Sequence, residues 1–184
     1  MQVMTTPAGN IWSGVVAPAL CLDLDGTVRY SKSNGLFIQD PSDIALFPDV
    51  EARIWEYRDN GYIIMAISNQ AGVAHGYKTV EQVEDELSVT ISLFNRNPFH
   101  LAKQCYHDGA GNRFPYNKRS LLRKPDIGML ALMEVEAFRA GYLIDWDESL
   151  FVGDRPEDAA CAANARISFQ SATEFFQRSE TPHA

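Results

Sequence analysis

The stretch CLDLDGTVRY at residues 21–30 places two carboxylates, Asp23 and Asp25, two residues apart at the end of an apolar run. Carboxylates this close repel each other, and the repulsion raises the pKa of one of them unless a cation compensates. The pair therefore indicates either a shared proton or a metal, and its hard oxygen ligands favour Mg2+. Asp154, with Asp158 one helical turn later, follows another apolar run and is a candidate to face the same cavity.

Several carboxylates in one cavity need positive partners. Lys124, directly before Pro125, is the candidate cation. Ser68 and Asn69 follow a third apolar run beside an expected helix start, where hydroxyl, amide and backbone N–H groups can bind phosphate. Together these groups suit phosphoryl transfer through an aspartyl-phosphate, because a carboxylate can attack phosphorus once a metal has neutralised the charge.

The elements expected to position these residues alternate between strand and helix. Apolar runs at 19–24, 62–68 and 149–153 predict buried parallel strands, each ending in one of the polar groups above. This alternation predicts an α/β fold, a Rossmann-like three-layer sandwich with a mainly parallel sheet, in which ligands collect beyond the carboxyl ends of the strands. Three intervening helices are predicted from an Asp49 cap closed by Asn60-Gly61, a Thr79–Gln82 capping box, and an Asp126 cap closed by Gly141.

The length of 184 residues predicts a single domain over 18–184 preceded by an arm at 1–17, with loops around the site at 29–48 and 105–122. A net charge of -8 argues against broad attraction to nucleic acid or anionic membranes. No apolar run approaches the roughly 20 residues of a membrane span. The first residues lack the features of a secretory signal, and three scattered cysteines suit a reducing compartment, so we expect a cytoplasmic protein.

Four motifs, in order along the chain, resemble those of the haloacid-dehalogenase-like (HAD) phosphatases, subfamily III. They are Asp23-Leu24-Asp25-Gly26-Thr27, Ser68-Asn69-Gln70, Lys124-Pro125 and Gly153-Asp154-Arg155-Pro156-Glu157-Asp158. The resemblance covers about residues 19–178 and implies an Mg2+-dependent phosphomonoesterase.

The resemblance also implies individual roles. Asp23 is the nucleophile, while Asp25 protonates the leaving alkoxide and then activates the hydrolytic water. Asp23, the Asp25 carbonyl and Asp154 hold Mg2+. The remaining implied roles are phosphate binding by Ser68, Asn69 and Lys124, and support by Thr27 and by Asp158, which orients Lys124 or a metal-bound water.

Within the superfamily, the sequences around Ser68, Lys124 and Asp154 resemble the heptose-bisphosphate and histidinol-phosphate phosphatase branch, and also the 3'-phosphatase domain of polynucleotide kinases. Only about 40 residues separate Asp25 from Ser68, and part of that stretch reads as a core helix, so a minimal cap or none is expected. The resemblance implies a small sugar phosphate or bisphosphate as substrate. The alternatives are a nucleic-acid 3' end as substrate and a non-enzymatic module that binds a phosphorylated ligand.

Cys105 and His107 match the first pair of structural zinc ligands in the bacterial heptose-bisphosphate phosphatases, but Ser120 and Leu122 replace the second pair. Two ligands do not complete a four-coordinate site, so structural Zn2+ is not expected. A basic run nearby reads either as a second anion site, with Arg123 as the candidate substrate contact, or as a solvated face: Arg113, Lys118, Arg119, Arg123 and Lys124. Loop aromatics either stack on a base or form a small core of their own: Tyr30, Phe37, Tyr106, Phe114 and Tyr116.

Overall fold

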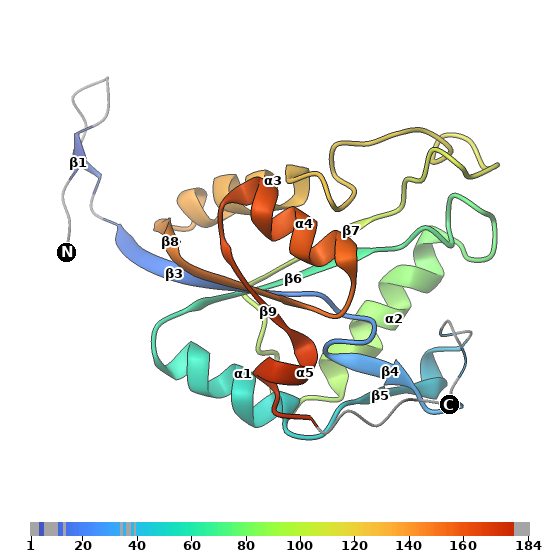
Figure 1. Ribbon diagram of the computed structural model, residues 1–184, viewed down its shortest axis with the longest axis horizontal. Coiled ribbons are helices and arrows are strands. Elements are labelled where there is room, and N and C mark those ends of the chain that lie inside the picture. Colours follow the sequence, from blue (N-terminus) through green and yellow to red (C-terminus); the bar gives the residue numbers. More distant parts are fainter. Residues whose placement is uncertain are drawn as a thin grey trace.

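A five-stranded parallel sheet in the order β7-β6-β3-β8-β9 forms the centre of the molecule in the computed structural model (Figure 1). The structure describes residues 14–178 except 34, 36, 37 and 39, together with the short antiparallel pair β1 (Met4–Thr5) and β2 (Ile11–Trp12). The strands of the sheet are β3 (Val15–Leu22), β6 (Ile63–Asn69), β7 (Leu101–Cys105), β8 (Tyr142–Gly153) and β9 (Ser168–Ser171).

The predicted strands are confirmed, although two of them are longer than the apolar runs suggested. β3 begins at Val15 and not at Ala19, and β8 begins at Tyr142 and not at Ser149. β3 occupies the middle of the sheet, and the chain continues to β6 and β7 on one side and to β8 and β9 on the other. The strand order therefore reverses beside β3, which is where α/β sheets bind ligands.

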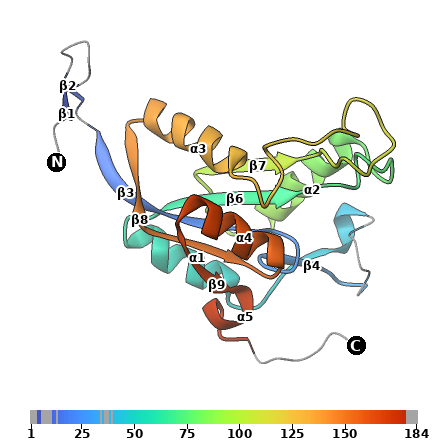
Figure 2. The same ribbon diagram turned by 45° about the horizontal axis from the view of Figure 1, so that its top comes forward.

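Helices cover both faces of the sheet, which confirms the predicted three-layer sandwich (Figures 1 and 2). Alternate residues of β3 point to opposite layers: Cys21 belongs to one apolar cluster with Met133 of α3, and Leu22 belongs to another with Ile54 of α1. The first layer holds α3 (Gly128–Arg139) and α4 (Pro156–Ala165), and the second holds α1 (Val50–Asp59), α2 (Val80–Ser92) and α5 (Ala172–Phe175).

The helix starts agree with the sequence at Asp49 and Thr79, the first without a side-chain hydrogen bond, and differ at Asp126. The Thr79–Gln82 capping box is present at the start of α2. Asp49 precedes α1, but its backbone is left-handed, with φ at 63°, and its side chain makes no capping hydrogen bond. The Asp126 cap is wrong, because Ile127 is the N-cap residue of α3.

Residues 29–48, predicted as a loop, contain a small antiparallel ribbon. β4 (Arg29–Ser31) pairs with β5 (Ile44–Leu46), and the 3-10 helix η1 (Pro41–Asp43) precedes β5. The ribbon lies next to α2 in Figure 1. No cap domain larger than this ribbon is found between β3 and α1 in the described residues, as predicted.

The division into an arm at 1–17 and a domain at 18–184 stays a prediction, and Phe37 lies outside the described residues. Within the described part of the chain, none of the helices combines the length and the apolar character that crossing a membrane requires.

Candidate active site

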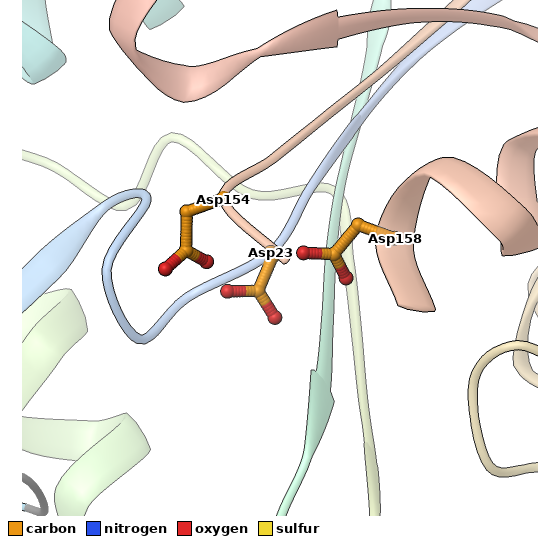
Figure 3. A group of neighbouring side chains, drawn as sticks. All are labelled: Asp23, Asp154 and Asp158. Carbon is orange, nitrogen blue, oxygen red and sulfur yellow. The ribbon is translucent and has the colours of Figure 1, made fainter. Parts of the chain in front are cut away.

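Three aspartates meet where β3 and β8 end (Figure 3). Asp23 follows β3, Asp154 follows the neighbouring strand β8, and Asp158 lies in the first turn of α4. One carboxylate oxygen from each lies within 4.8 Å of the others. Because parallel strands end at the same edge of a sheet, residues distant in the sequence reach one point here.

Lys124 is buried among these carboxylates. Its Nζ lies 2.5 Å from Asp23 Oδ1 and 2.6 Å from Asp158 Oδ1, and it donates a 3.2 Å hydrogen bond to the carbonyl of Ile67. These contacts match the three N–H donors of an ammonium group. Burial lowers the pKa of Lys124, but the two carboxylates outweigh burial and raise it, so the group stays charged.

Asn69 fixes the backbone of Lys124. Its Oδ1 accepts a 3.0 Å hydrogen bond from the Lys124 N–H, and its Nδ2 donates a 3.0 Å bond to the Lys124 carbonyl. Asn69 also lines the cavity described below, so its role as a phosphate ligand stays a prediction. The described contacts of its side chain serve Lys124.

The aspartate cluster carries more negative than positive charge. When all three carboxylates are ionised, the one ammonium of Lys124 leaves two negative charges uncompensated. Burial, opposed by Lys124 and reinforced by Asp158 and Asp25, raises the pKa of Asp23 to about 7. Burial and the neighbouring Asp158 likewise raise the pKa of Asp154. Two surplus charges on hard oxygen donors fit a divalent cation such as Mg2+.

Two glycines allow the carboxylates to approach this closely. Gly26 has φ at +84°, and a Cβ on it would lie 2.2 Å from Asp154 Oδ2. A Cβ on Gly153 would lie 2.4 Å from Asp158 Cβ. Both distances are far below van der Waals contact, so the cluster requires glycine at both positions.

Asp25 faces a different set of partners. Its carboxylate accepts bonds from Arg29 Nε at 2.8 Å and Gln70 Nε2 at 2.7 Å, with Ser68 Oγ at 3.4 Å. Burial raises the pKa of Asp25, but the charge and hydrogen bonds of Arg29 outweigh burial, and the pKa lies below its ordinary value. The carboxylate is therefore not part of the aspartate cluster, and a metal contact through the Asp25 carbonyl stays a prediction.

Ser68 and Thr27 are buried beside the carboxylates. Ser68 Oγ accepts a 2.8 Å hydrogen bond from Gln70 Nε2 and borders the cavity. Thr27 Oγ1 donates to Asp154 Oδ1 at 3.4 Å. Thr27 thus supports a predicted metal ligand.

A cavity of about 1080 Å3 opens over the aspartate cluster. Asp23, Asp25 and Asp154 form part of its floor, and Lys78, Arg123, Lys124 and Arg155 are positively charged residues of its lining. Of the five residues in the basic run, only Arg123 and Lys124 line this cavity in the described structure. The run is therefore not one continuous anion site.

The loops at 71–78 and 105–122 are joined beside Arg123. Arg123 Nη2 lies 3.5 Å from Asp108 Oδ2, and His75 Nε2 lies 3.2 Å from the same oxygen. The Ala74 carbonyl accepts bonds from two backbone N–H groups of the second loop, at 2.8 and 2.9 Å. The loop at 105–122 therefore supports the part of the cavity wall that residues 71–78 and Arg123 form.

Two of the five loop aromatics, Tyr106 and Tyr116, pack on each other. Tyr116 makes edge contacts with Tyr106 and His107, at 6.0 and 5.4 Å between ring centroids. Tyr30 lines the cavity, while Phe114 is exposed and lies under Lys118. These contacts favour the second alternative above, a small core within the loop.

The absence of structural Zn2+ stays a prediction. Cys105 is a buried free cysteine, and burial raises the pKa of its thiol. Among the described residues, Asp23, Asp154 and Asp158 form a group that could bind a metal ion, and Cys105 and His107 do not belong to it.

Sequence reasoning missed Arg29, Glu86 and Lys78. Arg29 is fully buried and pairs with Asp25, and Lys78 Nζ lies 2.6 Å from Glu86 Oε1. A signal was present: Glu86 stands between Val83 and Thr90 in the buried stripe of α2, where a charged residue requires a partner.

The family profile described as polynucleotide kinase 3 phosphatase matches residues 19–176. A D-glycero-D-manno-heptose-1,7-bisphosphate 7-phosphatase from Chlorobaculum tepidum is 28% identical over 154 residues, which are 82% of this chain and 76% of the relative.

Solved structures share the fold. A Mesorhizobium loti protein described as a HAD-like phosphatase is 25% identical, with a TM-score of 0.69 over 86% of this chain and 73% of that chain. The D,D-heptose 1,7-bisphosphate phosphatase from B. bronchiseptica, complexed with magnesium and phosphate, is 19% identical, with a TM-score of 0.63 over 90% of this chain and 88% of that chain. The resemblance stated from the motifs is confirmed.

Proposed function

The chain belongs to the polynucleotide kinase 3 phosphatase family and is a phosphoric monoester hydrolase, and on that premise we propose that it hydrolyses a small sugar phosphate or bisphosphate through an aspartyl-phosphate on Asp23. The observation that carries the proposal is the position of Asp23 at the floor of the cavity. There its carboxylate lies 2.5 Å from Lys124 Nζ, and one of its oxygens lies within 4.8 Å of carboxylate oxygens of Asp154 and Asp158.

The first half of the reaction transfers the phosphoryl group to Asp23. A carboxylate oxygen of Asp23 attacks phosphorus, the ester P–O bond breaks, and the leaving alkoxide takes a proton from Asp25. An arriving phosphate dianion disfavours a second negative charge beside it and so favours the protonated form of Asp25. Lys124 and Ser68 bind the phosphoryl oxygens, where each donor contributes a few kcal/mol to transition-state stabilisation.

The second half releases phosphate. Water attacks phosphorus, its proton passes to Asp25, and the bond between phosphorus and Asp23 breaks with its electron pair returning to the carboxylate. Asp23, Asp154 and the Asp25 carbonyl would hold the cation, and bound Mg2+ supplies charge neutralisation and Lewis-acid polarisation of the phosphoryl group. Asp158 orients Lys124, which it contacts at 2.6 Å.

The substrate class is supported by the relatives and by the cavity. The curated relatives are named for a sugar bisphosphate. Arg123 borders the cavity with about 29% of its side chain exposed and is the guanidinium proposed to bind a distal phosphate. The net charge of -8 gives a nucleic-acid 3' end less support.

Phosphate release in the presence of Mg2+ tests the proposal. The panel is a heptose 1,7-bisphosphate, hexose mono- and bisphosphates, histidinol phosphate, a 3'-phosphorylated oligonucleotide and 4-nitrophenyl phosphate. We expect the highest kcat/KM with a sugar phosphate or bisphosphate. Asp23→Asn should abolish turnover, because an amide is not a nucleophile. Asp147→Asn is the control and should leave turnover unchanged, because Asp147 is an exposed residue of β8, the strand that precedes Asp154.

Arg123→Met tests the substrate class separately. We expect KM for the preferred bisphosphate to rise about 10-fold, equivalent to ~1.4 kcal/mol, with little change for 4-nitrophenyl phosphate. Arg119→Met is the matched control, because the Arg119 side chain is 82% exposed and is not part of the cavity lining. A preference for the oligonucleotide would replace the sugar substrate, and turnover by Asp23→Asn equal to wild type would overturn the mechanism.

A further inference from the structure

Arg29 is a fully buried cation that donates four hydrogen bonds to Asp25 and α2. Nε–H donates to Asp25 Oδ1 at 2.8 Å, and Nη1 donates to the Glu86 carbonyl at 3.0 Å and to Thr90 Oγ1 at 2.8 Å. Nη2 donates to Asp25 Oδ2 at 3.3 Å and lies 3.6 Å from Glu86 Oε2. Four hydrogen bonds and the ion pair with Glu86 therefore fix the guanidinium between Asp25 and α2.

The charges along this contact chain alternate and balance. Asp25 pairs with Arg29, Arg29 with Glu86, and Glu86 with Lys78. Removal of one partner from a buried pair leaves an uncompensated charge, whereas a closed chain of pairs has none. The network therefore connects Asp25 to α2 through Arg29 and Glu86. Its two negative and two positive charges cancel, so it adds no net charge to the cavity.

The two oxygens of Asp25 differ in their surroundings. Oδ2 faces three donors, from Arg29, Gln70 and Ser68, whereas among the described residues Oδ1 accepts only the Nε–H of Arg29. A carboxylate oxygen has two lone pairs, so Oδ1 keeps one available. The Asp25 side chain is 40% exposed and borders the cavity, while Arg29 has no exposed side-chain surface.

We propose that Arg29 is a positioning residue that aims Oδ1 of Asp25 at the water that hydrolyses the aspartyl-phosphate. The inference rests on the proposed function and adds the residue that orients the base. In this step the water O–H bond breaks as its proton moves to Oδ1, the water oxygen bonds to phosphorus, and the P–O bond to Asp23 breaks. Arg29 touches neither water nor phosphate in this step.

The two half-reactions of 4-nitrophenyl phosphate separate this role from a structural one. Nitrophenolate leaves without needing a proton, so kcat/KM reports phosphoryl transfer to Asp23, whereas dephosphorylation limits kcat when the base is misplaced. We expect Arg29→Lys to keep kcat/KM within about twofold. Its kcat and KM should fall together by about 10- to 100-fold, since a displacement near 1 Å has effects of this order. A burst of nitrophenolate equal to the enzyme concentration should appear.

Thr90→Val is the second variant, because Lys does not reproduce the guanidinium contacts and Arg29→Lys can fail to fold. It removes one acceptor of Arg29 from a site outside the cavity lining, and we expect a smaller fall of kcat and KM, about threefold, in the same ratio. Ser88→Ala is its matched control: the hydroxyl of Ser88 also bonds a carbonyl four residues earlier on α2 but is exposed and does not contact Arg29. We expect wild-type kinetics from it.

The outcomes separate this inference from the proposed function. Equal losses of kcat and kcat/KM without a burst, in Thr90→Val or Arg29→Lys, would mean that Arg29 is structural only, while the phosphatase reaction stands. Wild-type kinetics in Arg29→Lys would overturn the inference as well. A wild-type protein that releases neither nitrophenolate nor phosphate, as Asp23→Asn is expected to do, would overturn the proposed function together with it.

Discussion

Gly26 shows how one residue type decides whether the aspartate cluster forms. The motif that supplies Asp23 and Asp25 continues with this glycine, which lies in the left-handed region with φ at +84°. Its missing side chain leaves the space that the Asp154 carboxylate occupies. The proposed metal site, made from two loops, thus depends on a residue without a Cβ atom at position 26.

Gly26→Ala should weaken Mg2+ binding by at least about 10-fold, because the new Cβ displaces Asp154. Gly61→Ala is the control: Gly61 has φ at +87°, but nothing lies within 4 Å of the position of its Cβ. Both variants should lose about 1–2 kcal/mol of stability through backbone strain. Calorimetric titration with Mg2+ separates them, and equal Mg2+ affinities in the two variants would contradict this account.

At the scale of elements, the cavity wall depends on the contact between two loops. The loop after β6 and the loop after β7 meet at the Ala74 carbonyl, and His75, Asp108 and Arg123 lie next to this contact. The strands fix only the first residues of each loop. The positions of the rim residues therefore depend on loop-to-loop packing.

Gly111→Ala should separate the two loops, because its Cβ would lie 2.5 Å from the Ala74 carbonyl oxygen. We expect KM for the preferred substrate to rise about 10-fold as Arg123 and His75 shift, and the loop at 105–122 to become sensitive to limited proteolysis. Gly109→Ala is the matched control, since its Cβ would meet the nearest atom at an ordinary 3.6 Å. Unchanged KM and protease resistance in Gly111→Ala would refute the role of this contact.

The sequence predicted the residues whose positions follow from the end of a strand. It missed features that depend on backbone dihedral angles or on pairing between residues far apart in the chain. Asp23, Ser68 and Asp154 were placed correctly at strand ends, because an apolar run ending in polar groups fixes their position along the strand. The Asp126 cap was wrong because a cap requires a particular backbone geometry, and Ile127 occupies that position. The pairing of Arg29 with α2 joins residues about 60 positions apart, which local patterns do not report.

At the scale of the whole molecule, the aspartate cluster proposed to bind Mg2+ and to react also destabilises the folded chain. Burial raises the pKa of Asp23 to about 7, above its ordinary value near 4. Between these pH values the folded protein binds more protons than the unfolded chain. Stability of the metal-free protein should therefore fall as the pH rises from about 4 to about 7, and Asp154 acts in the same direction.

Mg2+ should reverse this loss, because it offsets the charge that burial disfavours. We expect the rise in melting temperature on adding Mg2+ to a chelator-treated protein to be larger at pH 8 than at pH 5. Asp154→Asn should show a smaller Mg2+ effect at both pH values, since one ligand of the cluster is lost. An Mg2+ effect that is equal at pH 5 and pH 8, or unchanged in Asp154→Asn, would count against the cluster as the metal site.

The central position of β3 has a consequence for biosynthesis. One neighbour of β3 is β8, and the N–H of Ala19 bonds Ser149 Oγ across 130 residues of sequence. At a synthesis rate of about 5–20 residues per second, the ribosome completes β8 roughly 7 to 26 seconds after it completes β3. During that time the nascent chain has an apolar strand with an open edge, which is a template for pairing with other chains. We therefore expect chaperones to bind nascent or prematurely terminated chains at β3, the strand that leads into Asp23.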